Sequence, residues 1–156
     1  MKKWDIEDKI LLKNLKIFDL FKYKLVSPYS ESEKKSFDFF VFQSVDWINI
    51  LPITKNGKVV FVEQYRPGTD SITLELPGGM SNQDEEPIES AKRELKEETG
   101  FSMGEWSKLG VVHPNPAILT NQCHTFLALD VEEVSTPENA GSEYTQISFV
   151  DLQDLD

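Results

Sequence analysis

The chain has 156 residues, of which 27 are acidic and 16 are basic, so its formal net charge is −11. This length suits one domain with a hydrophobic core, and so acidic a surface disfavours nucleic acid and anionic membranes as partners. No apolar run approaches the roughly 20 residues of a membrane-spanning helix. The amino-terminal residues also lack the uninterrupted apolar stretch of a signal peptide, so we expect a cytoplasmic protein. With Cys123 as the one cysteine, no disulfide can form within the chain.

Strand patterns with turn signals fill the first half of the chain. Residues 16–26 and 37–43 are rich in aromatic and β-branched side chains and are predicted to pair as a hairpin across the polar segment 28–36. Asn56-Gly57 predicts a two-residue type I′ turn between two further strands. The strands on either side of this turn are 47–54 and 58–64. Further strands are predicted at 71–76, 107–113, 123–131 and 144–150.

Between Gly79 and Gly100 the apolar pattern changes to a helical period. Ile88, Ala91 and Leu95 recur at helical spacing and are expected to pack on the sheet. Pro87 suits a first helical turn, and Gly100 suits the position just past the last one. The pattern predicts a helix over Pro87–Thr99, and one helix among many strands indicates a mixed α/β domain.

Three carboxylates in the last turns of this helix point to a site. Glu94, Glu97 and Glu98 are related by three and four residues and share a stripe, where like charges repel one another and the helix dipole disfavours them. Stability alone favours lysine or arginine there, so the exception indicates function. Carboxylate oxygens suit Mg²⁺, and an acidic protein that binds phosphates needs such a cation. The alternative is an ordinary solvated face of the helix.

The segment from Gly78 to Phe101 resembles the Nudix box, Gly-x5-Glu-x7-Arg-Glu-U-x-Glu-Glu-x-Gly-U, in which U is a bulky apolar residue. The fixed positions of the box are filled by Gly79, Glu85, Arg93, Glu94, Glu97, Glu98 and Gly100, and its apolar positions by Leu95 and Phe101. The segments VVFVEQYRPGT and TLELPGGM are similar to the ADP-ribose pyrophosphatase branch of the Nudix hydrolases. Pro116, fifteen residues after Phe101, also matches a proline typical of that branch.

Two features depart from that branch. Its members usually have Pro-Gly and then Ser-Glu or Thr-Glu after the box, whereas this chain has Pro116-Ala117 and Thr120-Asn121. They also usually continue into a carboxy-terminal helix, and this sequence ends at Asp156.

The resemblance implies an α/β fold, a Nudix α/β/α sandwich with a mixed sheet. Residues 1–45 are then an N-terminal β-hairpin extension that serves dimerisation, and residues 46–156 are the hydrolase domain. The implied reaction is Mg²⁺-dependent hydrolysis of the pyrophosphate bond of ADP-ribose or a nucleotide sugar, and Mn²⁺ is expected to substitute. The implied partners are a nucleotide substrate and a second copy of the chain. Alternatives are a dinucleoside polyphosphate or other dinucleotide as substrate, or a Nudix domain that senses a nucleotide without cutting it.

The resemblance also assigns roles to residues. Glu94 and Glu98 are the expected main metal ligands, Glu97 joins or bridges, and the Gly78 carbonyl completes the site, while Glu85 braces the loop. Independently of the resemblance, Arg93 lies four residues before Glu97 and can hold its carboxylate in place, and both are counted with the catalytic group. The general base is expected in the loop STPENAGSEYT, as Glu143 or, alternatively, Glu138.

Outside the box, Arg66 is a candidate contact to the diphosphate, because guanidinium binds phosphate in a bidentate manner. Glu75 is expected to hold Arg66 or a ribose hydroxyl. Trp47 is either a stacking platform for a base or a core or interface residue. His113 and His124 are expected to be structural.

Overall fold

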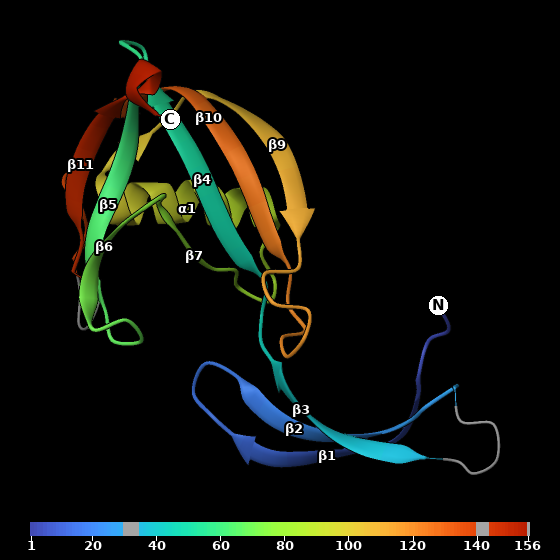
Figure 1. The fold of residues 1–156 in the computed structure, drawn as a ribbon. Helices are drawn as coiled ribbons and strands as arrows, with labels where there is room; N and C mark the ends of the chain where they lie inside the picture. The colour runs from blue at the N-terminus through green and yellow to red at the C-terminus, as the bar shows by residue number, and fades with distance from the viewer. Residues whose placement is uncertain (30–34, 140–143, 156) are drawn as a thin grey trace. The chain divides into compact units, whose positions relative to one another are not determined.

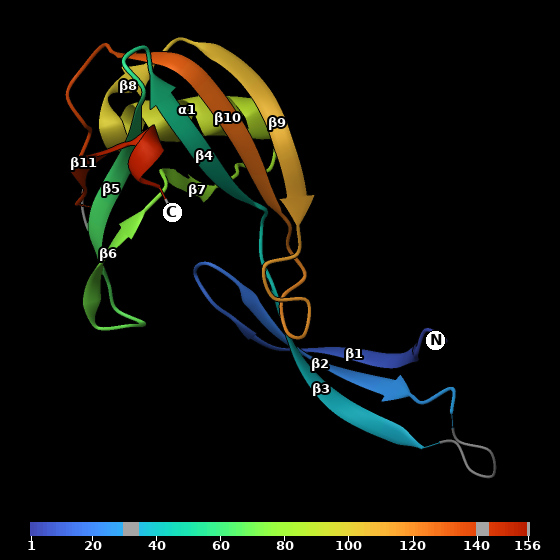
Figure 2. The same cartoon turned by 45° about the horizontal axis from the view of Figure 1, so that its top comes forward.

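The computed structural model describes residues 1–29, 35–139 and 144–155. They form two compact units, one of residues 1–45 with 113–122 and the other of residues 46–112 with 123–156. The first unit contains a three-stranded antiparallel sheet in the order β1-β2-β3 (Figure 2). Its strands are β1 (Asp5–Asn14), β2 (Asp19–Val26) and β3 (Ser36–Gln43).

The second unit is built on a mixed sheet whose main strand order is β11-β5-β4-β10-β8 (Figure 1). Strands β6, β7 and β9 pair with β5, β4 and β10 respectively. The pair β4–β10 is parallel and the other pairs are antiparallel. The strands are β4 (Trp47–Thr54), β5 (Lys58–Arg66), β6 (Ser71–Glu75), β7 (Gly78–Met80), β8 (Phe101–Ser102), β9 (Glu105–Val112), β10 (Cys123–Glu133) and β11 (Gln146–Asp151).

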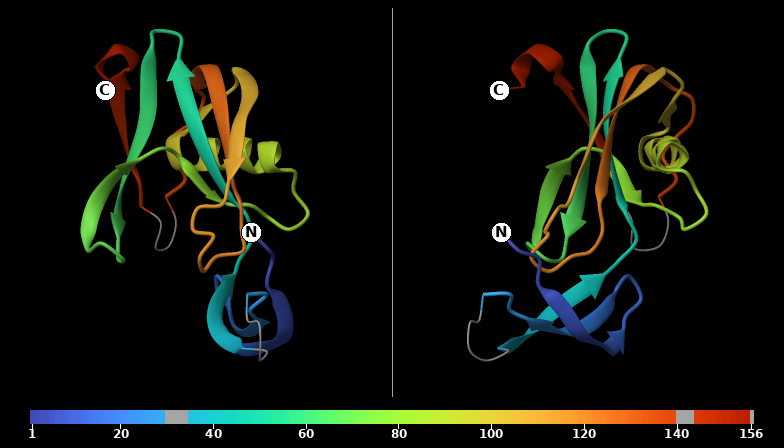
Figure 3. Two further views of the ribbon diagram at one scale, coloured as in Figure 1. Left: turned by 45° about the vertical axis from the view of Figure 1, so that its right-hand side comes forward. Right: turned by 90° about the vertical axis from the view of Figure 1, so that its right-hand side faces the viewer.

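Helix α1 (Pro87–Thr99) has the predicted bounds and packs on one face of this sheet, as the end-on view in Figure 3 shows. Its Ala91 and Leu95 are fully buried against β4, β5 and β10. Ile48, Ile50, Val60, Phe126 and Ala128 complete this core. The mixed sheet with its helix confirms the predicted fold class. Of the two helical layers of the implied sandwich, the described residues form one, and a short 3₁₀ helix, η1 (Leu152–Asp154), follows β11.

The helix ends at Gly100 for a steric reason. Gly100 has a φ of 73°, which is the left-handed region that favours glycine. A Cβ at this position would lie 1.9 Å from the Ser135 carbonyl oxygen. The end of α1 is therefore fixed both by the backbone angle and by the chain that passes beside it.

Among the differences between the structure and the sequence prediction, two concern β1 and the turn between β4 and β5. Strand β1 extends the predicted hairpin to three strands. The turn between β4 and β5 is not type I′, because Gly57 has a positive φ, 76°, but Asn56 does not. The loop has three residues, and the Gly57 amide donates to the Thr54 carbonyl at 2.9 Å, as in hairpins whose single left-handed residue follows a type I turn.

Candidate active site

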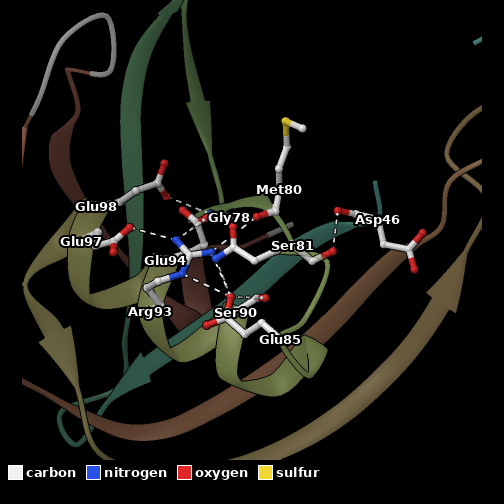
Figure 4. A network of polar contacts seen from close by, with 11 residues as sticks. Asp46, Gly78, Met80, Ser81, Glu85, Ser90, Arg93, Glu94, Glu97 and Glu98 are labelled. Atoms are coloured by element: carbon white, nitrogen blue, oxygen red, sulfur yellow. Dashed lines mark hydrogen bonds and ion pairs between the residues drawn. The ribbon is translucent and has the colours of Figure 1, made fainter. Parts of the chain in front are cut away.

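The last two turns of α1 face the segment Gly78–Met80, so the helical carboxylates meet a main chain that passes close by (Figure 4). The Gly78 amide donates to Glu98 Oε2 at 2.9 Å. Strand β7 is itself held by antiparallel pairing with β4, with Gly79 opposite Ile48. A charge-assisted hydrogen bond thus joins β7 to the end of α1, and sheet pairing joins β7 to β4.

Gly79 allows Glu94 to approach this main chain. A Cβ on Gly79 would lie 2.5 Å from Glu94 Cδ and 2.6 Å from each carboxylate oxygen. Any side chain at this position therefore competes with the Glu94 carboxylate for the same space. This contact gives a physical reason for the glycine at the first fixed position of the box.

Arg93 bridges two of the three carboxylates. Its Nη1 donates to Glu94 Oε1 at 2.9 Å and to Glu97 Oε2 at 3.0 Å. Burial lowers the pKa of Arg93, but the charges and hydrogen bonds of Glu94 and Glu97 outweigh it and leave the pKa raised. The predicted contact between Arg93 and Glu97 is present, and the same Arg93 nitrogen also donates to Glu94.

Glu85 braces the loop ahead of the helix through one oxygen. Glu85 Oε2 accepts from Ser90 Oγ at 2.7 Å, from Asn82 Nδ2 at 3.0 Å and from Arg93 Nε and Nη2 at 3.3 Å (Figure 4). Arg93 Nη2 also donates to the Met80 carbonyl at 3.4 Å. Glu85 therefore links the loop to the arginine that holds the metal-ligand candidates.

These contacts predict an acid-sensitive stability. The hydrogen bond from Ser90, and then the Arg93 charge, lower the pKa of Glu85 below its usual 4.5. A carboxyl whose pKa is lower in the folded state stabilises the fold above its unfolded pKa and loses that contribution as the pH falls through the folded value. We expect the melting temperature to fall below about pH 4.5, and to fall less steeply in Glu85→Gln. Ser90→Ala, which removes the largest cause, should flatten the same limb, and parallel curves for all three proteins would exclude this linkage.

The donor set of this site suits a hard divalent cation, because all of its candidate side-chain ligands are carboxylates. Within residues 1–29, 35–139 and 144–155, no three His, Cys, Asp or Glu side chains stand in a ready metal-binding arrangement. Arg93 holds Glu94 and Glu97 by the oxygens described above. A cation that takes both carboxylates must therefore compete with this arginine.

Of the two general-base candidates, Glu138 and Glu143, the structure describes Glu138. Glu143 lies outside the described residues. Glu138 is exposed, and its amide donates to the Glu97 carbonyl at 2.7 Å. The segment that carries Glu138 is therefore attached directly to the carboxy-terminal end of α1.

Arg66 and Glu75, the candidate substrate contacts, form one bidentate pair on β5 and β6. Arg66 Nε and Nη2 donate to Glu75 Oε1 and Oε2, each at 2.8 Å. The hydrogen bond from Arg66 lowers the pKa of Glu75. Glu75 thus orients the guanidinium, and about half of the Arg66 side chain, 48%, stays exposed.

The sequence missed the side-chain contact between Asp46 and His124. His124 Nε2 lies 3.0 Å from Asp46 Oδ2, and the Asp46 carbonyl accepts from the amide and hydroxyl of Ser81. No spacing rule predicts this contact, because 78 residues separate the pair. His113 Nδ1 is near the Asn121 carbonyl at 3.2 Å, and Trp47 is half-buried in β4.

Comparison with known proteins identifies the family. The NUDIX domain model matches residues 43–156. The ADP-ribose pyrophosphatase of Bacillus subtilis is 28% identical over 89% of this chain and 74% of its own length. The ADP-ribose pyrophosphatase of Saccharomyces cerevisiae is 38% identical, over 61% of this chain and 42% of its own length. A solved structure described as an ADP compounds hydrolase has a TM-score of 0.81 at 20% identity, covers 99% of this chain and 81% of that one, and shows the same fold.

The chain therefore belongs to the NUDIX family. This finding confirms the predicted family and the predicted class of enzyme, a hydrolase of nucleoside diphosphate derivatives. Members of this family generally need a divalent cation. Among the described residues, no helix has the length and apolar character to span a membrane.

Proposed function

We propose that this chain hydrolyses the pyrophosphate bond of ADP-ribose or a related nucleotide sugar with Mg²⁺, releasing a nucleoside monophosphate and a sugar phosphate. The observation that carries the proposal is the placement of Glu94 and Glu98 at the end of α1, against the segment Gly78–Met80, with Glu97 joined to Glu94 through Arg93. The ADP-ribose pyrophosphatases among its relatives support the substrate class.

The proposed metal ligands are Glu94 and Glu98, with Glu97 joining or bridging and the Gly78 carbonyl completing the set. When bound, the cation neutralises charge on the diphosphate and lowers the pKa of the attacking water. Mg²⁺ takes few protein ligands and keeps positions for water and substrate oxygens, and Mn²⁺ is proposed to substitute. Arg93 positions Glu97 and Glu94, and Gly79 leaves space for the Glu94 carboxylate.

The proposed general base is Glu143, with Glu138 as the alternative. A base in this loop accepts the proton of the water that attacks phosphorus. Arg66 is proposed to bind the diphosphate, and the bidentate contact from Glu75 supports its orientation. Phosphoryl transfer depends mainly on positioning and charge neutralisation, which are the tasks that these side chains are suited to perform.

A substrate panel tests this function. The purified chain is assayed with Mg²⁺ on ADP-ribose, GDP-mannose, UDP-glucose, NADH and diadenosine polyphosphates, and the products are scored for phosphate released by added phosphatase. We expect turnover of ADP-ribose or a nucleotide sugar that stops when the metal is chelated. Activity confined to the polyphosphates would reject the proposed substrate class.

One observation favours a second candidate, a nucleotide sensor that does not cut. Arg93 holds Glu94 and Glu97 together, and the described part of the chain has no ready cluster of three metal ligands. A sensor is expected to bind ADP-ribose in calorimetry and to leave it intact after prolonged incubation with Mg²⁺. Turnover in the panel excludes this candidate.

We also propose a homodimer, located in the cytoplasm. The strands of the first unit expose large apolar side chains, which marks an interaction surface; they include Ile6, Ile10, Leu11, Leu12, Phe37, Phe39 and Phe40. Light scattering at micromolar concentration tests the assembly, and a monomer mass would count against it.

A further inference from the structure

The carboxy-terminal end of α1 is held by residues that the metal and substrate assignments do not use. The last four carbonyls of a helix lack partners within the helix. In α1 the Lys96 carbonyl accepts from the Gly100 amide at 2.8 Å, and the Glu97 carbonyl accepts from the Glu138 amide at 2.7 Å. The Glu98 carbonyl accepts from the Thr145 hydroxyl at 2.9 Å. Glu138 and Thr145 thus hold the carbonyls of two residues whose carboxylates are the proposed metal ligands.

The Asn139 side chain links Thr145 to the part of the chain next to Glu138. Its Oδ1 accepts from the Thr145 amide at 2.8 Å, and its Nδ2 donates to the Thr145 carbonyl at 3.3 Å. The one Asn139 side chain therefore satisfies both main-chain groups of Thr145, as a neighbouring strand does. The Asn139 side chain therefore fixes the position of Thr145 relative to Glu138, which directly precedes Asn139 in the sequence.

The Thr145 hydroxyl is buried, so water cannot readily replace it as a hydrogen-bond donor. Thr145 is 5% exposed, and its hydroxyl lies 2.9 Å from the Glu98 carbonyl and 3.2 Å from Asn139 Oδ1. A hydroxyl has one proton, and the shorter contact assigns that proton to Glu98. Loss of the hydroxyl would remove this hydrogen bond to the Glu98 carbonyl at the end of the helix, in a place that water reaches poorly.

We propose that Asn139 and Thr145 are positioning residues for the metal site, and this inference rests on the proposed function. They hold the last turn of α1 so that Glu98 meets the Gly78 amide and Glu97 meets Arg93. They also place Glu138 beside Glu97. The side chains of Asn139 and Thr145 act through the main chain of the two glutamates and touch neither metal nor substrate.

The proposal predicts effects that depend on the hydroxyl of residue 145. Thr145→Val keeps the shape of the side chain and removes the donor, whereas Thr145→Ser keeps the donor. Because small misplacements of catalytic groups cost large factors in rate, we expect Thr145→Val to lower kcat about tenfold or more with a smaller change in KM. We expect Thr145→Ser to restore at least half of the wild-type rate, and Asn139→Ala to act like Thr145→Val.

The metal readout separates this inference from the proposed function. The Kd for Mn²⁺ is measured by electron paramagnetic resonance on the protein without substrate, and we expect it to rise severalfold in Thr145→Val and Asn139→Ala. Thr136→Val is the matched control, because Thr136 is exposed in the same segment. If the wild type binds Mn²⁺ but cuts no member of the panel, the function fails and the Mn²⁺ series still tests the positioning role.

Three results would overturn the positioning role. The first is a Thr145→Val protein that melts earlier but, while folded, keeps the wild-type kcat and Mn²⁺ affinity. The second is equal loss in Thr145→Ser and Thr145→Val. The third is a wild type that binds no Mn²⁺. Asn139→Ala decides the question if Thr145→Val does not fold, because Asn139 lies at the surface.

Discussion

Replacement of Glu98 by glutamine is expected to lower kcat/KM at least about 100-fold, the scale seen when one charge-stabilising group is removed from an active site. Glutamine keeps an oxygen that can accept from the Gly78 amide, as Glu98 Oε2 does at 2.9 Å. The loop contact is therefore retained while the negative charge and the strong metal ligand are lost. The rate is measured with saturating Mg²⁺, and the fold is checked by circular dichroism and melting temperature.

Glu89→Gln is the matched control for this variant. Glu89 lies on the same helix, is exposed, and pairs with Lys92 Nζ at 2.7 Å away from the site. An exposed pair of this kind contributes little to stability, so both rate and melting temperature should stay near the wild-type values. Full hydrolysis in Glu98→Gln would remove the metal assignment of Glu98.

Gly79→Ala is expected to weaken metal binding and lower activity while leaving most of the stability. The added Cβ would lie 2.5 Å from Glu94 Cδ. Because that neighbour is the end of a flexible side chain, the Glu94 carboxylate is displaced and the backbone stays in place. We expect the affinity for Mn²⁺ to fall by about tenfold or more, for a loss of fold stability of about 1 kcal/mol.

Gly78→Ala serves as the contrasting variant, because the obstacle there is backbone. Its Cβ would lie 2.0 Å from the Ile48 carbonyl oxygen, so β7 must move away from β4. We expect this variant to lose stability first, by about 3 kcal/mol or more. If Gly79→Ala binds Mn²⁺ and turns over substrate like the wild type, the close approach of Glu94 has no role in the site.

The helix was predictable because its signals are local. Pro87 and Gly100 mark the two ends, and Ile88, Ala91 and Leu95 give the buried face. Each of these features needs only a few neighbouring residues. The sequence therefore predicts the bounds of α1 to the residue.

Strand β1 was missed because its pairing is irregular. The register with β2 shifts between Ile6 and Asp8 and again between Leu11 and Lys13. Each bulge breaks the alternation by one residue, and all ten residues of the strand are exposed. A pattern that depends on alternate burial cannot detect such a strand.

The site was predictable as a set of carboxylates but not as a network. Helical spacing places Glu94, Glu97 and Glu98 on one stripe, and the contact from Arg93 to Glu97 follows from a spacing of four. The contact from Arg93 to Glu94 does not, since adjacent helical residues do not face each other. The contact between Thr145 and Glu98 joins residues 47 apart, which only the fold brings together.

The most direct test of the account is a crystal of the protein soaked with Mn²⁺ and a non-hydrolysable ADP-ribose analogue. We predict an anomalous peak within about 2.0–2.3 Å of carboxylate oxygens of Glu94 and Glu98, the range for a hard divalent cation bound to oxygen, with the diphosphate on its open side. A diphosphate bound elsewhere, with no peak at the end of α1 and with Arg93 still joined to Glu94 and Glu97, would contradict it.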